Sequence, residues 1–162
     1  MKSMVRLSSN HHKLVVFDLD MTLWPFRLDK HMRGPFSHNT SSKDVIDSCG
    51  QEVCLMEDSL RCLEYLKIQG YQIGVASRIK DISGAYQLIN LLGIAPFFDY
   101  REIYPGCKKR HFHNIHHKSN LDFGEMIFFD DDLRNIRDVS SLGVTAIHVP
   151  EGITKSIVSS IC

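Results

Sequence analysis

Residues 13–22, KLVVFDLDMT, decide how this chain folds. The apolar, β-branched run at 13–17 predicts a buried strand, and Asp18, Asp20 and Thr22 follow it at alternate positions. Alternate residues of an extended chain point the same way, so the two carboxylates can converge at the carboxyl end of the strand, where open α/β sheets bind ligands. Carboxylates this close need a cation or a shared proton. For this motif alone, a strand that ends in a polar turn is the simpler interpretation.

The rest of the chain alternates predicted strands and helices. Strands are predicted at 71–76, 97–103, 125–129 and 144–149; helices at 57–69, before Gly93, from Cys107, from Asp132 to Gly143, and around Ile153, Ile157 and Ile161. In the first helix, Leu60, Leu63 and Leu66 mark the expected buried face, and Asp58 or Ser59 is the expected cap. The alternation predicts a mostly parallel sheet with helices on both faces, which is a three-layer α/β/α fold.

Composition restricts the class of protein. The 162 residues suffice for a single domain, predicted to span 1–162 with a loose N-terminus at 1–12 and a flap or loop insertion at 27–55. Lys+Arg and Asp+Glu both number 19, so charge gives no reason to expect a nucleic-acid or membrane partner. No apolar run could span a bilayer, and the 5 cysteines contain no Cys-x-x-Cys pair. We expect a cytoplasmic protein with reduced thiols.

Polar groups follow the predicted strands at four points. These groups are the pair Asp18 and Asp20, then Ser77, then Lys108, then the pair Asp130 and Asp131. The carboxyl ends of parallel strands share one edge of the sheet, so the four groups can meet there. Carboxylates with a hydroxyl and a lysine suit Mg²⁺, which usually shares its coordination with a phosphate. A carboxylate is also a competent nucleophile toward phosphorus, so the cluster is typical of phosphoryl transfer.

In order and spacing, these groups resemble the four motifs of the haloacid dehalogenase (HAD)-like phosphatases. Within that superfamily, the chain is similar to the magnesium-dependent phosphatase-1 family from about residue 13 to 150. The similarity is carried by FDLDMTLWPF at 17–26, ASR at 76–78, REIYPG at 101–106, HHK at 116–118, FFDD at 128–131 and RNI at 134–136. The resemblance implies a Rossmann-like HAD fold, Mg²⁺ as cofactor and phosphatase activity.

Carried over to this sequence, the resemblance implies two catalytic roles. Asp18 would attack phosphorus, form an aspartyl-phosphate and bind Mg²⁺ through its other oxygen. Asp20 would protonate the leaving oxygen and then deprotonate the attacking water, while its backbone carbonyl binds Mg²⁺. Asp20 needs a raised pKa to act as an acid, and closeness to Asp18 and to the phosphate acts in that direction.

The remaining roles concern phosphate and metal. Ser77 would donate a hydrogen bond to a phosphoryl oxygen, and Lys108 would neutralise charge shared by the nucleophile and the phosphate. Arg78 is a candidate for substrate contact. Asp131 would be the direct Mg²⁺ ligand of the last motif, with Asp130 as a second ligand or as a partner of the ligands.

The gaps between the motifs leave room for only a minimal cap, a short loop or hairpin after the first strand. An open site would admit a phosphorylated protein or small molecule, and the resemblance suggests phosphotyrosine or sugar phosphates attached to amines, such as amine-linked fructose-6-phosphate. We expect a monomer. Two alternatives are a catalytically inactive scaffold that binds phosphoproteins and a receiver-type signalling domain; in a receiver, the lysine would follow the last acidic group rather than precede it.

Several side chains allow two interpretations. Trp24 and Phe26 could line the mouth of the site or belong to the core. The histidines of the basic segment, at 111, 113, 116 and 117, are expected on an exposed helical face, because no cysteine or carboxylate completes a zinc site with them. His148 is expected to be a core residue.

Overall fold

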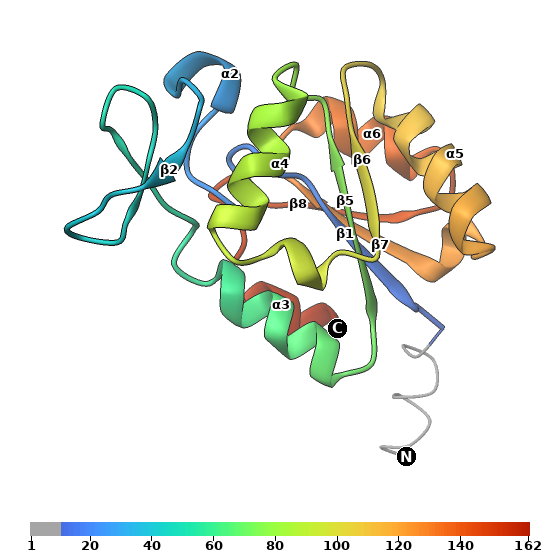
Figure 1. The fold of residues 1–162 in the computed structure, drawn as a ribbon. Coiled ribbons are helices and arrows are strands. Elements are labelled where there is room, and N and C mark those ends of the chain that lie inside the picture. Colours follow the sequence, from blue (N-terminus) through green and yellow to red (C-terminus); the bar gives the residue numbers. More distant parts are fainter. Residues whose placement is uncertain (1–10) are drawn as a thin grey trace.

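The computed structural model describes residues 11–162, so most of the predicted loose N-terminus lies outside the described residues. The centre of the fold is a five-stranded sheet in the order β6-β5-β1-β7-β8 (Figure 1). The strands are β1 (Leu14–Phe17), β5 (Gln72–Ser77), β6 (Tyr100–Ile103), β7 (Met126–Asp130) and β8 (Thr145–His148). All neighbours pair in parallel, which confirms the predicted sheet.

Helices cover both faces of this sheet. One face carries α3 (Ser59–Ile68), α4 (Ile82–Leu91) and α7 (Lys155–Ile161), and the other carries α5 (Lys108–Ser119) and α6 (Leu133–Ser140) (Figure 1). The alternation of β1 explains this: Val15 and Phe17 join the larger core cluster, while Leu14 and Val16 join the smaller one with α5 and α6. The three-layer α/β/α prediction is therefore confirmed.

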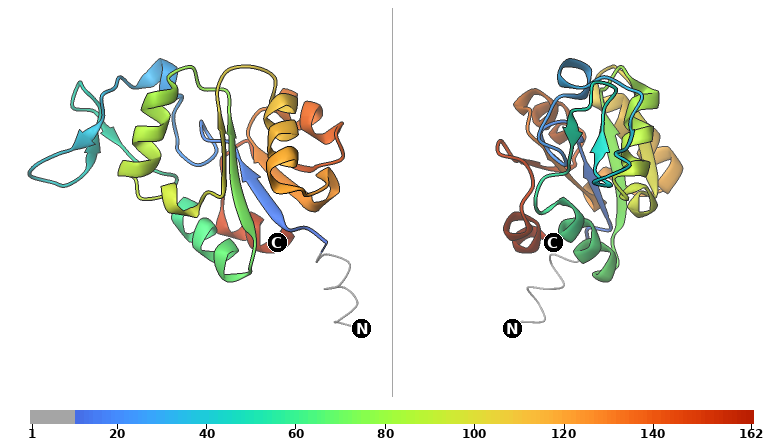
Figure 2. Two further views of the ribbon diagram at one scale, coloured as in Figure 1. Left: turned by 45° about the vertical axis from the view of Figure 1, so that its right-hand side comes forward. Right: turned by 60° about the vertical axis from the view of Figure 1, so that its left-hand side comes forward.

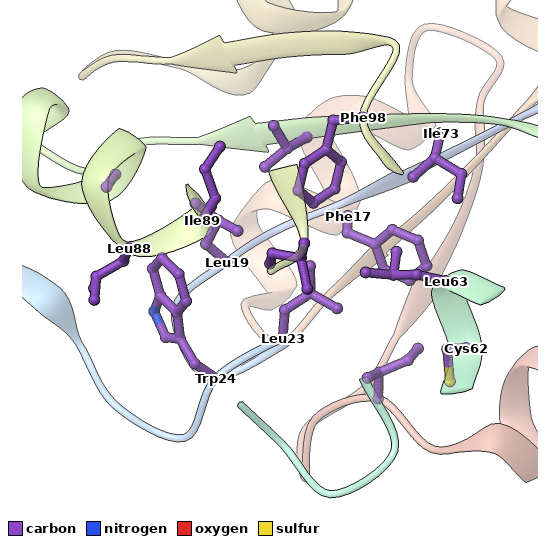
Figure 3. Packing of buried hydrophobic residues seen from close by; sticks show 14 of the residues in the cluster. Phe17, Leu19, Leu23, Trp24, Cys62, Leu63, Ile73, Leu88, Ile89 and Phe98 are labelled. Atoms are coloured by element: carbon purple, nitrogen blue, oxygen red, sulfur yellow. The ribbon is translucent and has the colours of Figure 1, made fainter. Parts of the chain in front are cut away.

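The larger core surrounds the end of β1 (Figure 3). Phe17 stacks on Phe129 of β7 with ring centroids 5.5 Å apart. Trp24 is fully buried near Leu88 of α4, and its ring stacks on Phe26 at 5.3 Å. Both aromatic residues of the Trp-Pro-Phe segment thus belong to the core, and neither lines the mouth of the site.

The segment between β1 and α3 forms a small cap beside the sheet (Figures 1 and 2). It contains α2 (Leu28–His31) and an antiparallel three-stranded sheet of β2 (Ser37–His38), β3 (Val45–Ile46) and β4 (Glu52–Val53). The buried Asp47 carboxylate accepts hydrogen bonds from the N–H groups of Arg33, Cys49 and Gln51, which closes the turn after β3. Two 3₁₀ turns, Ala95–Phe97 and Phe123–Glu125, complete the fold.

One expectation for α3 is wrong and another holds only in part. Leu60 is 42% exposed, and Cys62 occupies the buried face with Leu63 and Leu66 instead. Asp58 is the N-cap residue, as expected, but its carboxylate makes no capping hydrogen bond; it accepts one from the backbone N–H of Lys155 on α7 at 2.9 Å.

The expectation of exposed histidines on α5 is confirmed at His113 and His117 and wrong at the other two positions. His111 is completely buried, and His116 is half-buried with its Nδ1 2.6 Å from the carbonyl oxygen of Leu121. His148, expected in the core, is only half-buried at the end of β8, and its Nε2 lies 2.9 Å from the carbonyl oxygen of Asp131. The ring nitrogens of His111 and His148 thus contact backbone carbonyl oxygens of other segments, which the periodicity of the sequence does not reveal.

Two leucines of α3, one buried and one exposed, allow a test of which face of this helix packs against the core. Leu63→Ala should lower the free energy of unfolding by about 2–5 kcal/mol, because it removes fully buried methyl groups and leaves a cavity. Leu60→Ala, the same change one turn away, should cost less than about 1 kcal/mol. Urea denaturation of both variants measures the difference, and equal losses would contradict the observed face of α3.

Candidate active site

The site is organised around one buried ammonium group. Lys108 Nζ lies 2.8 Å from Asp18 Oδ1 and 2.7 Å from Asp130 Oδ2. All three residues are almost inaccessible, with Lys108 1%, Asp18 6% and Asp130 0% exposed. Burial alone would lower the pKa of Lys108, but the two carboxylates outweigh it and raise that pKa. Lys108 is therefore charged, and it holds the ends of β1 and β7 together.

A tight turn after β1 presents the Asp18 carboxylate. The carbonyl oxygen of Leu19 accepts hydrogen bonds from the N–H groups of Thr22 and Leu23, and Met21 adopts a left-handed conformation with φ 59°. The turn brings Thr22 Oγ1 back to donate to Asp18 Oδ2 at 3.2 Å. One oxygen of Asp18 thus faces Lys108 and the other faces a hydroxyl.

Asp20 is held by the segment that follows the turn. Its Oδ1 accepts hydrogen bonds from Trp24 Nε1 at 2.8 Å and from the Leu28 N–H at 3.1 Å. Burial raises the pKa of Asp20, and the two hydrogen bonds oppose the shift without cancelling it. The carboxyl group is therefore closer to proton-donor function than a free Asp. The sequence did not reveal the bond to Trp24, because an indole donor in a core position gives no separate signal.

Ser77 and Arg78 lie at the end of the adjacent strand β5. Ser77 is buried, and its Oγ accepts a hydrogen bond from the Ile79 N–H at 3.2 Å. Arg78 is exposed, and its Nη1 lies 3.4 Å from Oδ1 of Asn135 on α6. Asn135 is a site residue that sequence reasoning missed: its amide donates to Asp130 Oδ2 at 3.0 Å.

The three acidic groups of β1 and β7 offer oxygen ligands to a cation. Carboxylate oxygens of Asp18, Asp130 and Asp131 all lie within 4.8 Å of one another. Burial raises the pKa values of Asp18 and Asp131, and a bound cation would favour their charged forms. Asp130 already accepts from Lys108, Asn135 and the Asp132 N–H. Asp131 is half-buried and faces the pocket, with Arg27 Nη2 4.0 Å away. This hard, oxygen-only donor set fits Mg²⁺.

These side chains line a cavity of about 170 Å³ at the carboxyl edge of the sheet. The lining includes five carboxylates, of Asp18, Asp20, Asp29, Asp131 and Asp132, and four cations, of Arg27, Arg78, Lys108 and Arg134. The balance leaves the cavity slightly negative, so one divalent cation makes it positive and receptive to a phosphate dianion. A larger cavity of about 510 Å³ lies at the opposite edge, beside Lys13 and Tyr71, far from this cluster.

Comparison with known proteins assigns the chain to a family. A family model described as Acid Phosphatase matches residues 10–160. Magnesium-dependent phosphatase 1 from Homo sapiens is 46% identical over 147 residues, covering 91% of this chain and 83% of the human protein. The chain belongs to the magnesium-dependent phosphatase 1 family.

Two further matches agree with this. The HAD-like hydrolase superfamily protein P8B7.31 from Schizosaccharomyces pombe is 41% identical over 143 residues, covering 82% of this chain and 83% of that protein. A phosphatase domain in the N-terminal part of the protein BF1531 from Bacteroides fragilis, solved with Mg, superposes with a TM-score of 0.64 at 18% identity. That match covers 91% of this chain and 39% of the other, and it supports the HAD-like fold.

The protein is thus a magnesium-dependent phosphatase of the HAD superfamily, as the motifs predicted, with Mg²⁺ as its cofactor. Membership in a family of phosphatases argues against the receiver and inactive-scaffold alternatives. Among residues 11–162, no helix has the length and hydrophobicity needed to cross a membrane. Asp18, Asp20, Ser77, Arg78, Lys108 and Asp131 all line the one cavity of this phosphatase that holds the acidic cluster, while Asp130 lies behind it.

Neighbouring acidic residues of the phosphatase allow a matched test of the metal site. Asp131→Asn should weaken Mg²⁺ binding by about tenfold or more, because it removes a charged oxygen ligand. Asp132→Asn should change it little, because Asp132 caps α6 by accepting from the Arg134 N–H at 2.8 Å, a role that Asn also fills. Isothermal titration with Mg²⁺ measures both, and similar losses in the two variants would exclude Asp131 as the specific ligand.

Proposed function

We propose that this phosphatase hydrolyses phosphomonoesters through an aspartyl-phosphate on Asp18. The observation that carries the proposal is the pair of ion contacts from Lys108 to Asp18 and Asp130, which fixes one carboxylate oxygen of Asp18 at the cavity wall. Bound Mg²⁺ would supply charge neutralisation for the phosphoryl oxygens. Asp18, Asp131 and the backbone carbonyl of Asp20 would hold it, and Asp130 would orient Lys108 and Asn135.

In the first step, a carboxylate oxygen of Asp18 attacks phosphorus as the bond to the ester oxygen breaks. Asp20 gives its proton to that leaving oxygen, which its raised pKa favours. In the second step, Asp20 takes a proton from water, and the water oxygen attacks phosphorus to release phosphate and restore Asp18. Ser77 Oγ donates a hydrogen bond to a phosphoryl oxygen throughout, and Lys108 balances the charge on the nucleophile and the phosphate.

The substrate must fit a shallow, open cavity. The cap is a small sheet on one side, and between residues 11 and 162 no larger lid closes over the site. Arg27 and Arg134 are paired with Asp131 and Asp132, whereas within residues 11–162 the guanidinium of Arg78 has a hydrogen bond to the neutral amide oxygen of Asn135 and no ion pair. Arg78 is thus the rim cation best placed to bind a substrate anion. We infer that the substrate is protein phosphotyrosine or an amine-linked sugar phosphate such as fructose-6-phosphate on an amine.

We also propose that the enzyme acts as a monomer on a phosphorylated small molecule or phosphoprotein, with no nucleic-acid or membrane partner. The equal numbers of acidic and basic residues support the expected absence of a nucleic-acid or membrane partner. Phosphate release from a phosphotyrosine peptide, a phosphoserine peptide and fructose-6-phosphate on lysine compares the substrate classes. Preference for the phosphoserine peptide would contradict both inferred classes.

The nucleophile is tested by Asp18→Asn. This variant should lose activity by about a thousandfold or more toward an aryl phosphate with saturating Mg²⁺, because an amide cannot attack phosphorus. Phosphate release with and without Mg²⁺ is the measurement. Activity that survives in Asp18→Asn would refute the assignment.

The two roles of Asp20 can be separated by the leaving group. An aryl phosphate releases an acidic phenol, which leaves without full protonation, so Asp20→Asn should still form the phosphoenzyme. Its hydrolysis should stall because the base for water is gone. Intact-mass spectrometry after brief mixing should then show one added phosphoryl group in Asp20→Asn and none in the double variant that also carries Asp18→Asn. An unmodified Asp20→Asn protein that still turns over would contradict the predicted stall and the assignment of Asp20 as the base for water.

A further inference from the structure

One buried titratable side chain has no role in the mechanism above. His111 lies on α5, one turn after Lys108, and is 0% exposed. Its ring nitrogens face three backbone carbonyl oxygens. Nε2 lies 2.8 Å from the oxygen of Ser77 and 2.8 Å from that of Tyr104, and Nδ1 lies 3.2 Å from that of Cys107.

Carbonyl oxygens only accept hydrogen bonds, so the imidazole must be the donor. Burial lowers the pKa of His111; the three carbonyls oppose that shift, and the positive charge of Lys108 adds to it. The two shorter contacts are both at Nε2 and require a hydrogen there, which the Ser77 and Tyr104 oxygens share. The imidazole thus joins the end of β5 to the segment that leads into α5.

The ring itself is held in place from the other side. The Tyr104 ring stacks on the imidazole, with centroids 4.2 Å apart and planes inclined by 16°. Tyr104 Oη donates to Glu102 at 2.7 Å and accepts from the Asn114 amide at 2.7 Å. Lys118 at the far end of α5 pairs with the same Glu102 at 2.6 Å. The imidazole is therefore held by Tyr104, which is itself fixed by Glu102 on β6 and by Asn114 in the second half of α5.

The geometry points to His111 as a positioning residue that sets Ser77 and Lys108 at the spacing needed to grip one phosphoryl group. Ser77 carries the hydroxyl of the proposed phosphate site, and Lys108 carries its ammonium group. His111 lies on the same helix as Lys108 and contacts the backbone carbonyl oxygen of Ser77. The backbone carbonyl oxygen of Ser77 also accepts a hydrogen bond from the Tyr104 N–H at 3.0 Å. Loss of the imidazole should therefore loosen the end of β5 without disrupting the sheet. The inference rests on the proposed role of Ser77.

Substitutions that keep or remove the Nε2 donor test this role. His111→Gln keeps an amide donor near the Nε2 position, whereas His111→Phe keeps the stacked ring and removes the donor. His117→Phe makes the same change on the exposed side of the same helix and is the control. The measurements are KM for an aryl phosphate, the inhibition constant of inorganic phosphate, kcat, Mg²⁺ affinity and the melting temperature.

We expect His111→Phe to raise both KM and the phosphate inhibition constant by about tenfold, the loss typical of one hydrogen bond to a charged group. Mg²⁺ affinity should not change, because His111 contacts no proposed metal ligand. His111→Gln should restore phosphate affinity, and His117→Phe should match the wild type. If His111→Phe does not fold, His111→Asn replaces it, since its shorter amide cannot reach the Ser77 and Tyr104 oxygens. A lower melting temperature with unchanged KM and phosphate inhibition would show a merely structural role and overturn the inference.

The double variant with Ser77→Ala decides whether His111 acts through Ser77. If it does, His111→Phe should weaken phosphate binding in the wild type and add little in the Ser77→Ala background. Fully additive losses would overturn the inference. If Ser77→Ala alone leaves phosphate affinity unchanged, the proposed role of Ser77 fails instead, so the two failures are distinguishable.

Discussion

The structure depends on the burial of one positive charge between two negative ones. Lys108 reaches Asp18 and Asp130 from the first turn of α5, with all three groups removed from water. Removing one partner from such a cluster would leave an uncompensated buried charge, which is far more costly than losing a surface ion pair. The sheet order makes the contact possible, because β1 and β7 are neighbours. The strand order reverses between them: β5 and β6 are added on one side of β1, and β7 and β8 on the other. Chemistry and fold are therefore specified by the same contact.

Residues whose signal is local could be predicted from the sequence. The buried run before Asp18 gave β1, glycines ended the helices, and the polar residues after each strand gave Ser77, Lys108 and Asp131. Contacts that depend on the direction of side chains in the folded chain could not. Asn135 and Trp24 donate to carboxylates five and four residues away, those of Asp130 and Asp20, and His111 contacts the distant carbonyl group of Ser77, but no sequence pattern marks any of these three pairs. Leu60 was misplaced because its spacing to Leu63 and Leu66 fits one helical face, whereas the folded chain buries Cys62 with those two residues instead.

The small sheet of the cap is contributed by a segment of the chain that carries none of the proposed catalytic residues. Every proposed catalytic group lies at the end of a sheet strand, in the turn directly after it, or in the first turn of the helix that follows. The segment 27–55 is inserted between β1 and α3 and has its own small sheet. Its side chains can change without altering the positions of Asp18 or Lys108. Substrate choice can therefore vary within the family while the chemistry stays constant.

The central position of β1 has a consequence for synthesis. Leu14 pairs with Gln72 on one side and with Met126 on the other, so β1 precedes both of its neighbours in the chain, one of them by more than a hundred residues. While the ribosome adds the intervening residues, the apolar edge of β1 has no partner on its β7 side. Such an edge pairs readily with other chains. The central sheet can therefore be completed only after β7 has emerged, late in the synthesis of the chain.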